Sequence, residues 1–172
     1  SLTGIMDHQT LSNCKDTTKK WLREMKDVAI NTNETWADML GINPSTAITC
    51  VKPSGTVSQL TNTASGIHPR HNQYYIRTVR QDNKDPLTSF MKECGFPWEP
   101  AFGKEDSTTI FSFGCKSPSG AVTRNQRTAI EQLEHWLVYQ ENWCEHKPSI
   151  TAYIREHEWM KVGAWVYEHF DA

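Results

Sequence analysis

Apolar residues recur at helical spacing over Asp16–Leu40, which is the longest patterned stretch of the chain. One stripe along this stretch is apolar and consists of Trp21, Met25, Val28, Trp36 and Met39. A stripe of this kind predicts an amphipathic helix. Gly41 suits the position just after a helix end, and Pro44 cannot continue the helix. We therefore expect the helix to end at Leu40.

Shorter runs of β-branched, aromatic and apolar residues predict strands. The predicted strands are Ala47–Val51, Tyr74–Arg80, Thr108–Phe113 and Ser149–Ile154, with Leu2–Met6 as a strand end. The first of them, Ala47–Val51, is a short run of β-branched and apolar residues, which is typical of a buried strand.

Three more helices are expected after residue 80. Pro86 suits the first position of a helix that runs to Cys94. Thr123 and Gln126 have the spacing of a capping box and predict the start of a long helix. The apolar positions expected along that helix are Ile130, Leu133, Leu137 and Cys144. The last predicted helix is Glu156–Phe170.

The predicted helices and strands alternate along the chain, which indicates an α/β architecture with a partly parallel sheet. No internal repeat and no low-complexity linker divides the 172 residues. A chain of this length can form one domain with its own core. We therefore expect residues 1–172 to be one domain or a contiguous part of one. A first residue other than Met, and an end just after a helical stretch, favour a part of a longer chain.

Composition removes several classes of function. The net charge of −2 offers no basic excess for duplex nucleic acid. No apolar run approaches the length of a membrane span or a signal peptide. The five cysteines form no CxxC pair, so we expect reduced, mostly buried thiols and a cytoplasmic protein. The seven histidines have no metal-ligand spacing, so no metal site is predicted. The tryptophans of the predicted helices are expected to pack in the core or to contact a barrel from a helix.

The stretch with the clearest chemistry is Lys52–Ser58, Lys-Pro-Ser-Gly-Thr-Val-Ser, which follows the predicted strand Ala47–Val51. A loop between a strand end and a helical turn can bind an anion through its unpaired N–H groups. Gly55 permits close backbone approach, and hydroxyl donors come from Ser54, Thr56 and Ser58. This is not a Walker A loop, because Gly-x4-Gly-Lys-Ser/Thr is absent. The residues alone therefore indicate an anion-binding loop, and an ordinary surface loop remains the alternative.

Three ordered motifs add a family resemblance. Val51–Ser58, then Ser65-Gly66-Ile67-His68-Pro69, then Tyr74–Arg80 closely resemble the adenosylcobalamin-dependent (class II) ribonucleotide reductases. Further similarity lies in the segment Ser1–Asp7 and continues to Trp143, so that it covers essentially the whole chain. The resemblance implies the C-terminal part of a ten-stranded α/β barrel and a ribonucleotide substrate.

In that family the equivalent loop binds the substrate's phosphates. The resemblance therefore assigns phosphate binding to the loop Pro53–Ser58: Ser54 and Thr56 through hydroxyls, Gly55 and Val57 through backbone N–H groups, and Ser58 with less weight. It also implies, for the complete enzyme, adenosylcobalamin as cofactor, thiyl-radical chemistry and a thioredoxin-type reductant. A triphosphate substrate is favoured over a diphosphate.

The family's Asn-Pro-Cys-Gly-Glu segment does not occur in this chain. We therefore expect the radical cysteine to lie outside it, and the chain alone not to reduce nucleotides. Two other interpretations stay open from the sequence. One is a non-catalytic α/β module that binds phosphoanions, and the other is a relative of the class I or class III reductases.

Overall fold

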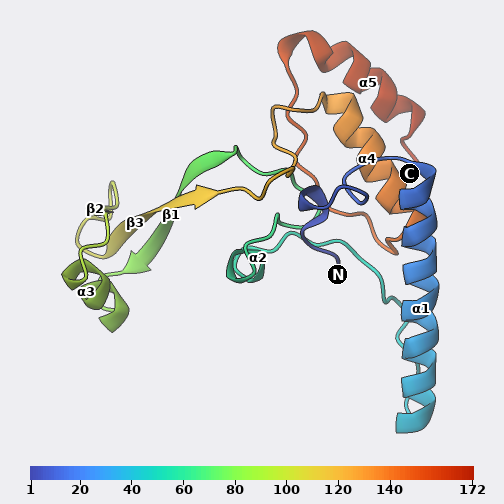
Figure 1. Ribbon diagram of the computed structural model, residues 1–172, viewed down its shortest axis with the longest axis horizontal. Helices are drawn as coiled ribbons and strands as arrows, with labels where there is room; N and C mark the ends of the chain where they lie inside the picture. Colours follow the sequence, from blue (N-terminus) through green and yellow to red (C-terminus); the bar gives the residue numbers. More distant parts are fainter. The chain divides into compact units, whose positions relative to one another are not determined.

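The computed structural model describes residues 1–172, which form two compact units (Figure 1). Unit 1 comprises Ser1–His71 and Pro118–Ala172, and unit 2 comprises Asn72–Ser117. Both units contain helices, and the sheet belongs to unit 2. The chain is therefore a mixed α/β structure, as the alternating pattern predicted.

Unit 1 is mainly helical. Its α-helices are α1 (Asp16–Leu40), α2 (Val57–Leu60), α4 (Ala129–Asn142) and α5 (Trp159–Glu168), with 3-10 turns at Ile5–Asp7 and Glu156–Glu158. Helix α4 packs against both α1 and α5 (Figure 1). Helix α1 has the predicted bounds, and Gly41 ends it in the left-handed conformation, with φ 65°. The Gly41 N–H donates to the carbonyls of Ala37 and Asp38.

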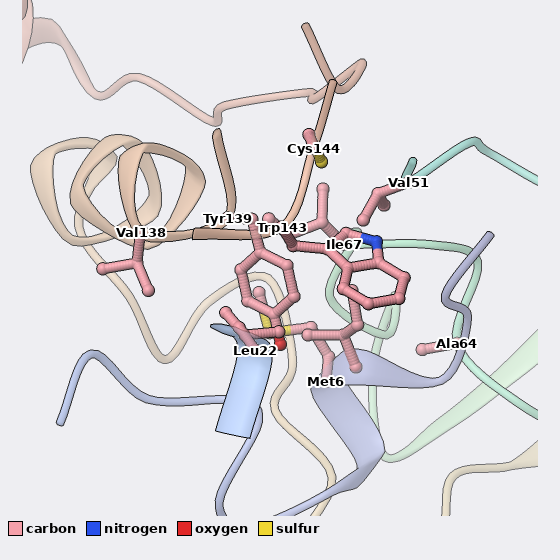
Figure 2. Packing of buried hydrophobic residues seen from close by; sticks show 10 residues of the cluster. Met6, Leu22, Val51, Ala64, Ile67, Val138, Tyr139, Trp143 and Cys144 are labelled. Carbon is pink, nitrogen blue, oxygen red and sulfur yellow. The ribbon is translucent and has the colours of Figure 1, made fainter. Parts of the chain in front are cut away.

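The core of unit 1 gathers residues from distant parts of the chain (Figure 2). Its buried members are Ile5, Met6, Leu22, Val51, Ala64, Ile67, Val138, Tyr139, Trp143 and Cys144. Helix α1 contributes Leu22. The two large aromatic side chains come from the end of α4, which contributes Tyr139, and from Trp143 just after it. Val51 and Ile67 come from the segments that flank the Lys52–Ser58 loop, so the base of that loop is part of the core.

The predicted start of the long helix was wrong by several residues. Helix α4 begins at Ala129, and its capping box consists of Thr128 and Glu131. The Thr128 hydroxyl accepts from the Glu131 N–H at 3.2 Å, while the Glu131 carboxylate accepts from the Thr128 N–H at 2.8 Å. At the predicted cap only half of the box is present, because the Thr123 N–H donates to Gln126 Oε1. That contact closes a turn instead.

The buried face of α4 also differs from the prediction. It is largely polar and consists of Ala129, Gln132, His135, Val138, Tyr139 and Asn142. Ile130, Leu133 and Leu137 are only half-buried, and Cys144 lies beyond the helix end. Hydrogen bonds to Leu11 allow His135 and Tyr139 to face inward, because the Leu11 carbonyl lies 2.9 Å from both His135 Nε2 and the Tyr139 hydroxyl.

Two predicted strands, Ala47–Val51 and Ser149–Ile154, form no sheet in this chain, and Leu2–Met6 leads into a 3-10 turn. The backbone of Ala47–Val51 makes individual hydrogen bonds with other parts of the chain and does not pair with a neighbouring strand. The N–H groups of Ile48 and Thr49 donate to the Glu145 carboxylate at 2.5 and 2.6 Å. The Cys50 carbonyl accepts from the Trp143 indole and from the Leu2 N–H. In Ser149–Ile154, exposed and half-buried residues alternate, so a strand-like pattern is kept without a partner.

Unit 2 is a three-stranded antiparallel sheet with one helix. Strands β1 (Tyr74–Asp82) and β3 (Thr108–Lys116) pair from Tyr74 opposite Lys116 to Asp82 opposite Thr108, and β2 (Trp98–Pro100) lies on the other side of β3. Helix α3 (Pro86–Glu93) starts with Pro86, and the Asp85 carboxylate accepts from the Leu87 N–H. Both predicted strands and the helix are confirmed. The partly parallel sheet was wrong for this chain, because β1 and β3 are neighbours that run in opposite directions.

Side-chain burial bears on the tryptophans and corrects the prediction about the thiols. Trp21, Trp36 and Trp159 are 41, 55 and 60% exposed, whereas Trp143 and Trp165 are buried. All five cysteines are free thiols, and Cys144 alone is buried, so the thiols are not mostly buried. The helices of this chain include none with the length and apolar character that crossing a bilayer requires.

Candidate phosphate-binding site

The loop Pro53–Ser58 leads from residues 47–51, which belong to no helix or strand, into the short helix α2. The Thr56 carbonyl accepts from the N–H groups of Gln59 and Leu60, at 3.0 and 3.2 Å, so the helical turn begins after Thr56. The first N–H groups of a helix have no partner inside it. In α2 these groups belong to Val57 and Ser58, and Val57 is 63% exposed. This agrees with the helical turn expected after the motif.

The three hydroxyl groups of the loop have different surroundings. Ser58 is fully buried, and its hydroxyl donates to the Ser54 carbonyl at 2.9 Å, so it supports the loop from inside. The Ser54 hydroxyl oxygen is itself buried and has no hydrogen-bond partner in the chain. Thr56 is exposed and makes no capping bond with its side chain. The Ser58 hydroxyl is thus engaged inside the loop, whereas no bond of this kind engages the hydroxyls of Ser54 and Thr56.

The remaining two loop positions leave room for an approaching group. Pro53 and Gly55 are exposed. A Cβ atom built on Gly55 would meet nothing within 4 Å. The space beside the Gly55 backbone is therefore open.

The base of the loop is fixed by Ser65 and Gly66. The Ser54 N–H donates to the Ser65 hydroxyl at 2.8 Å. Gly66 has a φ of +54°, and a Cβ atom placed on it would lie 2.9 Å from the Lys52 carbonyl oxygen. Only glycine suits both the conformation and the contact. The Ser65-Gly66-Ile67 segment, which the sequence singled out as a motif, therefore lies directly under the start of the loop.

A buried ion pair lies behind this segment, and sequence reasoning missed it. Arg70 is 5% exposed, and its guanidinium donates twice to the Asp7 carboxylate, from Nε at 2.9 Å and from Nη2 at 2.8 Å. The same carboxylate accepts from the Ala64 N–H at 2.7 Å. The pair joins residues 63 positions apart, so no local pattern could reveal it.

Glu145 holds the segment that precedes the loop, because its carboxylate accepts the N–H groups of Ile48 and Thr49. Hydrogen bonds from the backbone N–H groups of Thr49 and Ile48 lower the pKa of the Glu145 carboxyl below its usual value. The Thr49 hydroxyl donates to the Trp143 carbonyl at 2.6 Å. The segment that enters the loop is thus attached to the residues after α4.

None of the thiols with a perturbed pKa is activated. Burial raises the pKa of Cys144 to about 11, and burial also raises that of Cys14. A raised thiol pKa disfavours the thiolate, which is the nucleophilic form. No group of three or more histidine, cysteine or acidic side chains is placed to hold a metal ion.

The architecture matches part of a known enzyme structure. A crystal structure of a B12-dependent (class II) ribonucleotide reductase superimposes with a TM-score of 0.76 and 25% sequence identity. The match covers 88% of this chain and 22% of that one. No family model matches the sequence.

Curated relatives point to the same class. An adenosylcobalamin-dependent ribonucleoside-triphosphate reductase of Levilactobacillus brevis is 37% identical over 138 residues, 78% of this chain. A probable enzyme of the same name from Dictyostelium discoideum is 33% identical over 138 residues, or 76% of the chain. That of Lactobacillus delbrueckii is 28% identical over 154 residues. The chain spans about a fifth of these relatives' length, at 18, 18 and 21%.

The fold is therefore that of a segment of the ribonucleotide reductases. The chain is homologous to part of the adenosylcobalamin-dependent, class II enzymes of this family, as the motifs had indicated.

Proposed function

We propose that this chain is the substrate-phosphate segment of an adenosylcobalamin-dependent reductase that converts ribonucleotides to 2′-deoxyribonucleotides. The observation that carries the proposal is the buried Ser54 hydroxyl, which has no partner in the chain and lies two residues before Thr56, the cap of the short helix α2. Buried polar groups are rarely left without a hydrogen bond. A ligand oxygen would supply one, and the homologous enzymes are reductases of ribonucleoside triphosphates.

Each loop residue has a distinct role in this proposal. Ser54 and Thr56 donate hydroxyl hydrogen bonds to phosphate oxygens, while Gly55 and Val57 offer backbone N–H groups. Pro53 stiffens the turn because its ring fixes φ. Ser58 contributes through the bond to the Ser54 carbonyl and not by touching phosphate. A phosphate held here fixes the ribose in position, which is a proximity contribution to catalysis.

The barrel proposed for the longer protein explains the two strand-like segments that form no sheet. Residues 47–51 and Ser149–Ile154 belong to no helix or strand and have no strand partner in this chain. We assign both to the ten-stranded α/β barrel implied by the resemblance, where neighbouring strands would supply the missing ladder. In this arrangement the loop follows a barrel strand, a common place for ligand sites in α/β folds.

The cofactor belongs to the longer protein in this proposal. Three surface hollows of this chain have volumes of about 330 to 430 Å³, and none of the three is lined by Pro53–Ser58. The largest is lined by β1 and β3 alone, so it cannot enclose a molecule as large as adenosylcobalamin. We assign no cofactor contact to the residues of this chain. The radical cysteine and the contacts of a thioredoxin-type reductant are likewise assigned outside it, in a cytoplasmic enzyme.

The proposal is tested by nucleotide binding to the full-length protein. We expect Ser54→Ala with Thr56→Ala to weaken binding of a ribonucleoside triphosphate at least tenfold, because hydrogen bonds to charged groups contribute roughly 1.5–3 kcal/mol each. Ser119→Ala is the control, since it removes an exposed hydroxyl far along the chain from the loop. An unchanged Kd in the double variant would refute the phosphate loop. The same titration with diphosphates decides the substrate preference.

A further inference from the structure

We propose that the Asp7–Arg70 ion pair is a positioning device for substrate, which holds the Ser54 end of the loop in its binding conformation. The inference rests on the proposed function of the loop. Neither residue lies in the loop, and neither is expected to touch the nucleotide.

The first step is the number of donors that meet one carboxylate. Asp7 accepts from the Ala64 N–H at 2.7 Å and from two nitrogens of Arg70 at 2.9 and 2.8 Å. Both side chains are largely buried, with 4% of Arg70 and 13% of Asp7 exposed. An Arg–carboxylate fork has a fixed planar geometry. The position of the Ala64 backbone is therefore set by the ion pair.

The second step leads from Ala64 to the loop. Ser65 is the next residue, and its hydroxyl accepts the Ser54 N–H at 2.8 Å. The Ala64 carbonyl is held as well, by the Gly4 N–H at 2.7 Å and the Thr3 hydroxyl at 3.0 Å. Ala64 is thus fixed on both of its polar groups. The side chain that accepts the Ser54 backbone N–H therefore belongs to Ser65, the residue directly after Ala64.

The third step concerns the turn that precedes Ala64. Asn62 has a φ of +49°, an unusual conformation for a residue other than glycine. Arg70 holds it, because Nη2 donates to the Asn62 carbonyl at 2.6 Å and Nη1 to Asn62 Oδ1 at 3.3 Å. The Thr63 N–H in turn donates to the Ser58 carbonyl at 2.8 Å. Arg70 therefore fixes the route of the chain from the end of α2 back to Ser65.

A purely structural role predicts lower stability without a specific effect on substrate, so the variant needs a matched control. Asp7→Asn keeps the shape but replaces one acceptor oxygen by an NH₂ donor, which would face the donors on Arg70 and Ala64. Glu158→Gln is the control. Glu158 is also a buried carboxylate that accepts two backbone N–H bonds, from Ala129 and Arg155, and it lies at the start of α5.

Two measurements on the full-length protein test the positioning role. In Asp7→Asn we expect hydrogen exchange to accelerate in peptides containing Ser54 and Ala64, and KM for the nucleotide to rise between about ten- and a hundredfold, since small displacements of a positioning group have effects of this size. Glu158→Gln should accelerate exchange near Ala129 and leave both Ser54 exchange and KM unchanged.

Other results overturn the inference in distinct ways. If Ala64 exchanges faster in Asp7→Asn while Ser54 exchange and KM do not change, the ion pair does not position the loop. If Glu158→Gln raises KM equally, the effect is general destabilisation. If exchange at Ser54 accelerates but Ser54→Ala with Thr56→Ala leaves nucleotide affinity intact, the proposed function fails and the mechanical link stands. Should Asp7→Asn not fold, Arg70→Lys decides, because it keeps the positive charge and loses the two-pronged contact with Asp7. A raised KM with faster Ser54 exchange supports the inference, and unchanged values overturn it.

Discussion

Gly66 offers the sharpest test of how the loop is built. Replacing it by Ala combines two separate penalties. A φ of +54° is unfavourable for a residue with a Cβ atom by roughly 1–2 kcal/mol. The new Cβ atom would also lie 2.9 Å from the Lys52 carbonyl oxygen and 3.3 Å from Val51 Cγ1. The carbonyl must shift, and forced repacking of this kind costs about 1–3 kcal/mol. We expect Gly66→Ala to destabilise the protein by about 2–5 kcal/mol in total.

Gly41→Ala separates the two penalties. Gly41 has a φ of +65°, but a Cβ atom there would meet nothing within 4 Å, so the conformational penalty acts alone, at about 1–2 kcal/mol. The two variants are compared in the full-length protein by thermal unfolding and by nucleotide titration. Gly66→Ala should lower the Tm about twice as far and also weaken nucleotide binding, because Lys52 directly precedes the loop. Equal Tm shifts would mean that the contact with Lys52 is not tight, and unaltered affinity would mean that the loop base does not influence the site.

Two further predictions concern helix α4. Thr128→Ala should cost about 1 kcal/mol through loss of the cap, whereas Thr123→Ala should cost less than about 0.5 kcal/mol, and denaturant unfolding that ranks them the other way would contradict the observed helix start. Burial lowers the pKa of His135 to about 4, below its usual 6.5. The unfolded chain binds this proton first as the pH falls, so stability should be complete above about pH 7 and decline by up to about 3 kcal/mol towards pH 4. Unfolding midpoints across this range should decline less in His135→Leu, and parallel curves for the two proteins would exclude His135 as the cause.

The elements that the sequence predicted correctly are those with local determinants. Helix α1 has a periodic stripe and a glycine at its end, and β1, β3 and α3 have short, strongly patterned segments with a proline or an aspartate at the boundary. The residues 47–51 and Ser149–Ile154 have equally good strand patterns and form no sheet here. Strand formation needs a neighbour, and a pattern does not say whether the neighbour is in the same chain.

The error at α4 shows a different limit. Two residue pairs satisfy the same spacing rule, Thr123 with Gln126 and Thr128 with Glu131. In each pair the second side chain accepts the backbone N–H of the threonine. What separates them is whether the backbone that follows is helical. The inward side of α4 was misjudged for a related reason. Gln132 and His135 are nearly fully buried while Leu133 is not, because residues 8–13 approach that face and bring the Leu11 carbonyl to it.

At the candidate site, the sequence identified the loop and its hydroxyls but not what supports them. From the residue types alone, Ser54, Thr56 and Ser58 were equivalent hydroxyl donors. The structure sets Ser58 apart, because its hydroxyl donates to the Ser54 carbonyl. Asp7 ends one segment that was quoted for its resemblance and Arg70 directly follows another, yet nothing local marks them as a pair. Contacts across 63 positions depend on the fold.

The exposed apolar stripe of α1 shows what an amphipathic pattern can and cannot predict. Val28, Trp36 and Met39 are 65, 55 and 69% exposed, whereas Leu22, beside the stripe, is fully buried. The periodicity predicted the helix correctly. It could not predict which part of that side this chain covers, because α4 and the N-terminal turn reach α1 only near Leu22. An apolar stripe on a segment that spans about a fifth of its relatives is therefore better interpreted as one side of a larger packing arrangement than as the core of a separate domain.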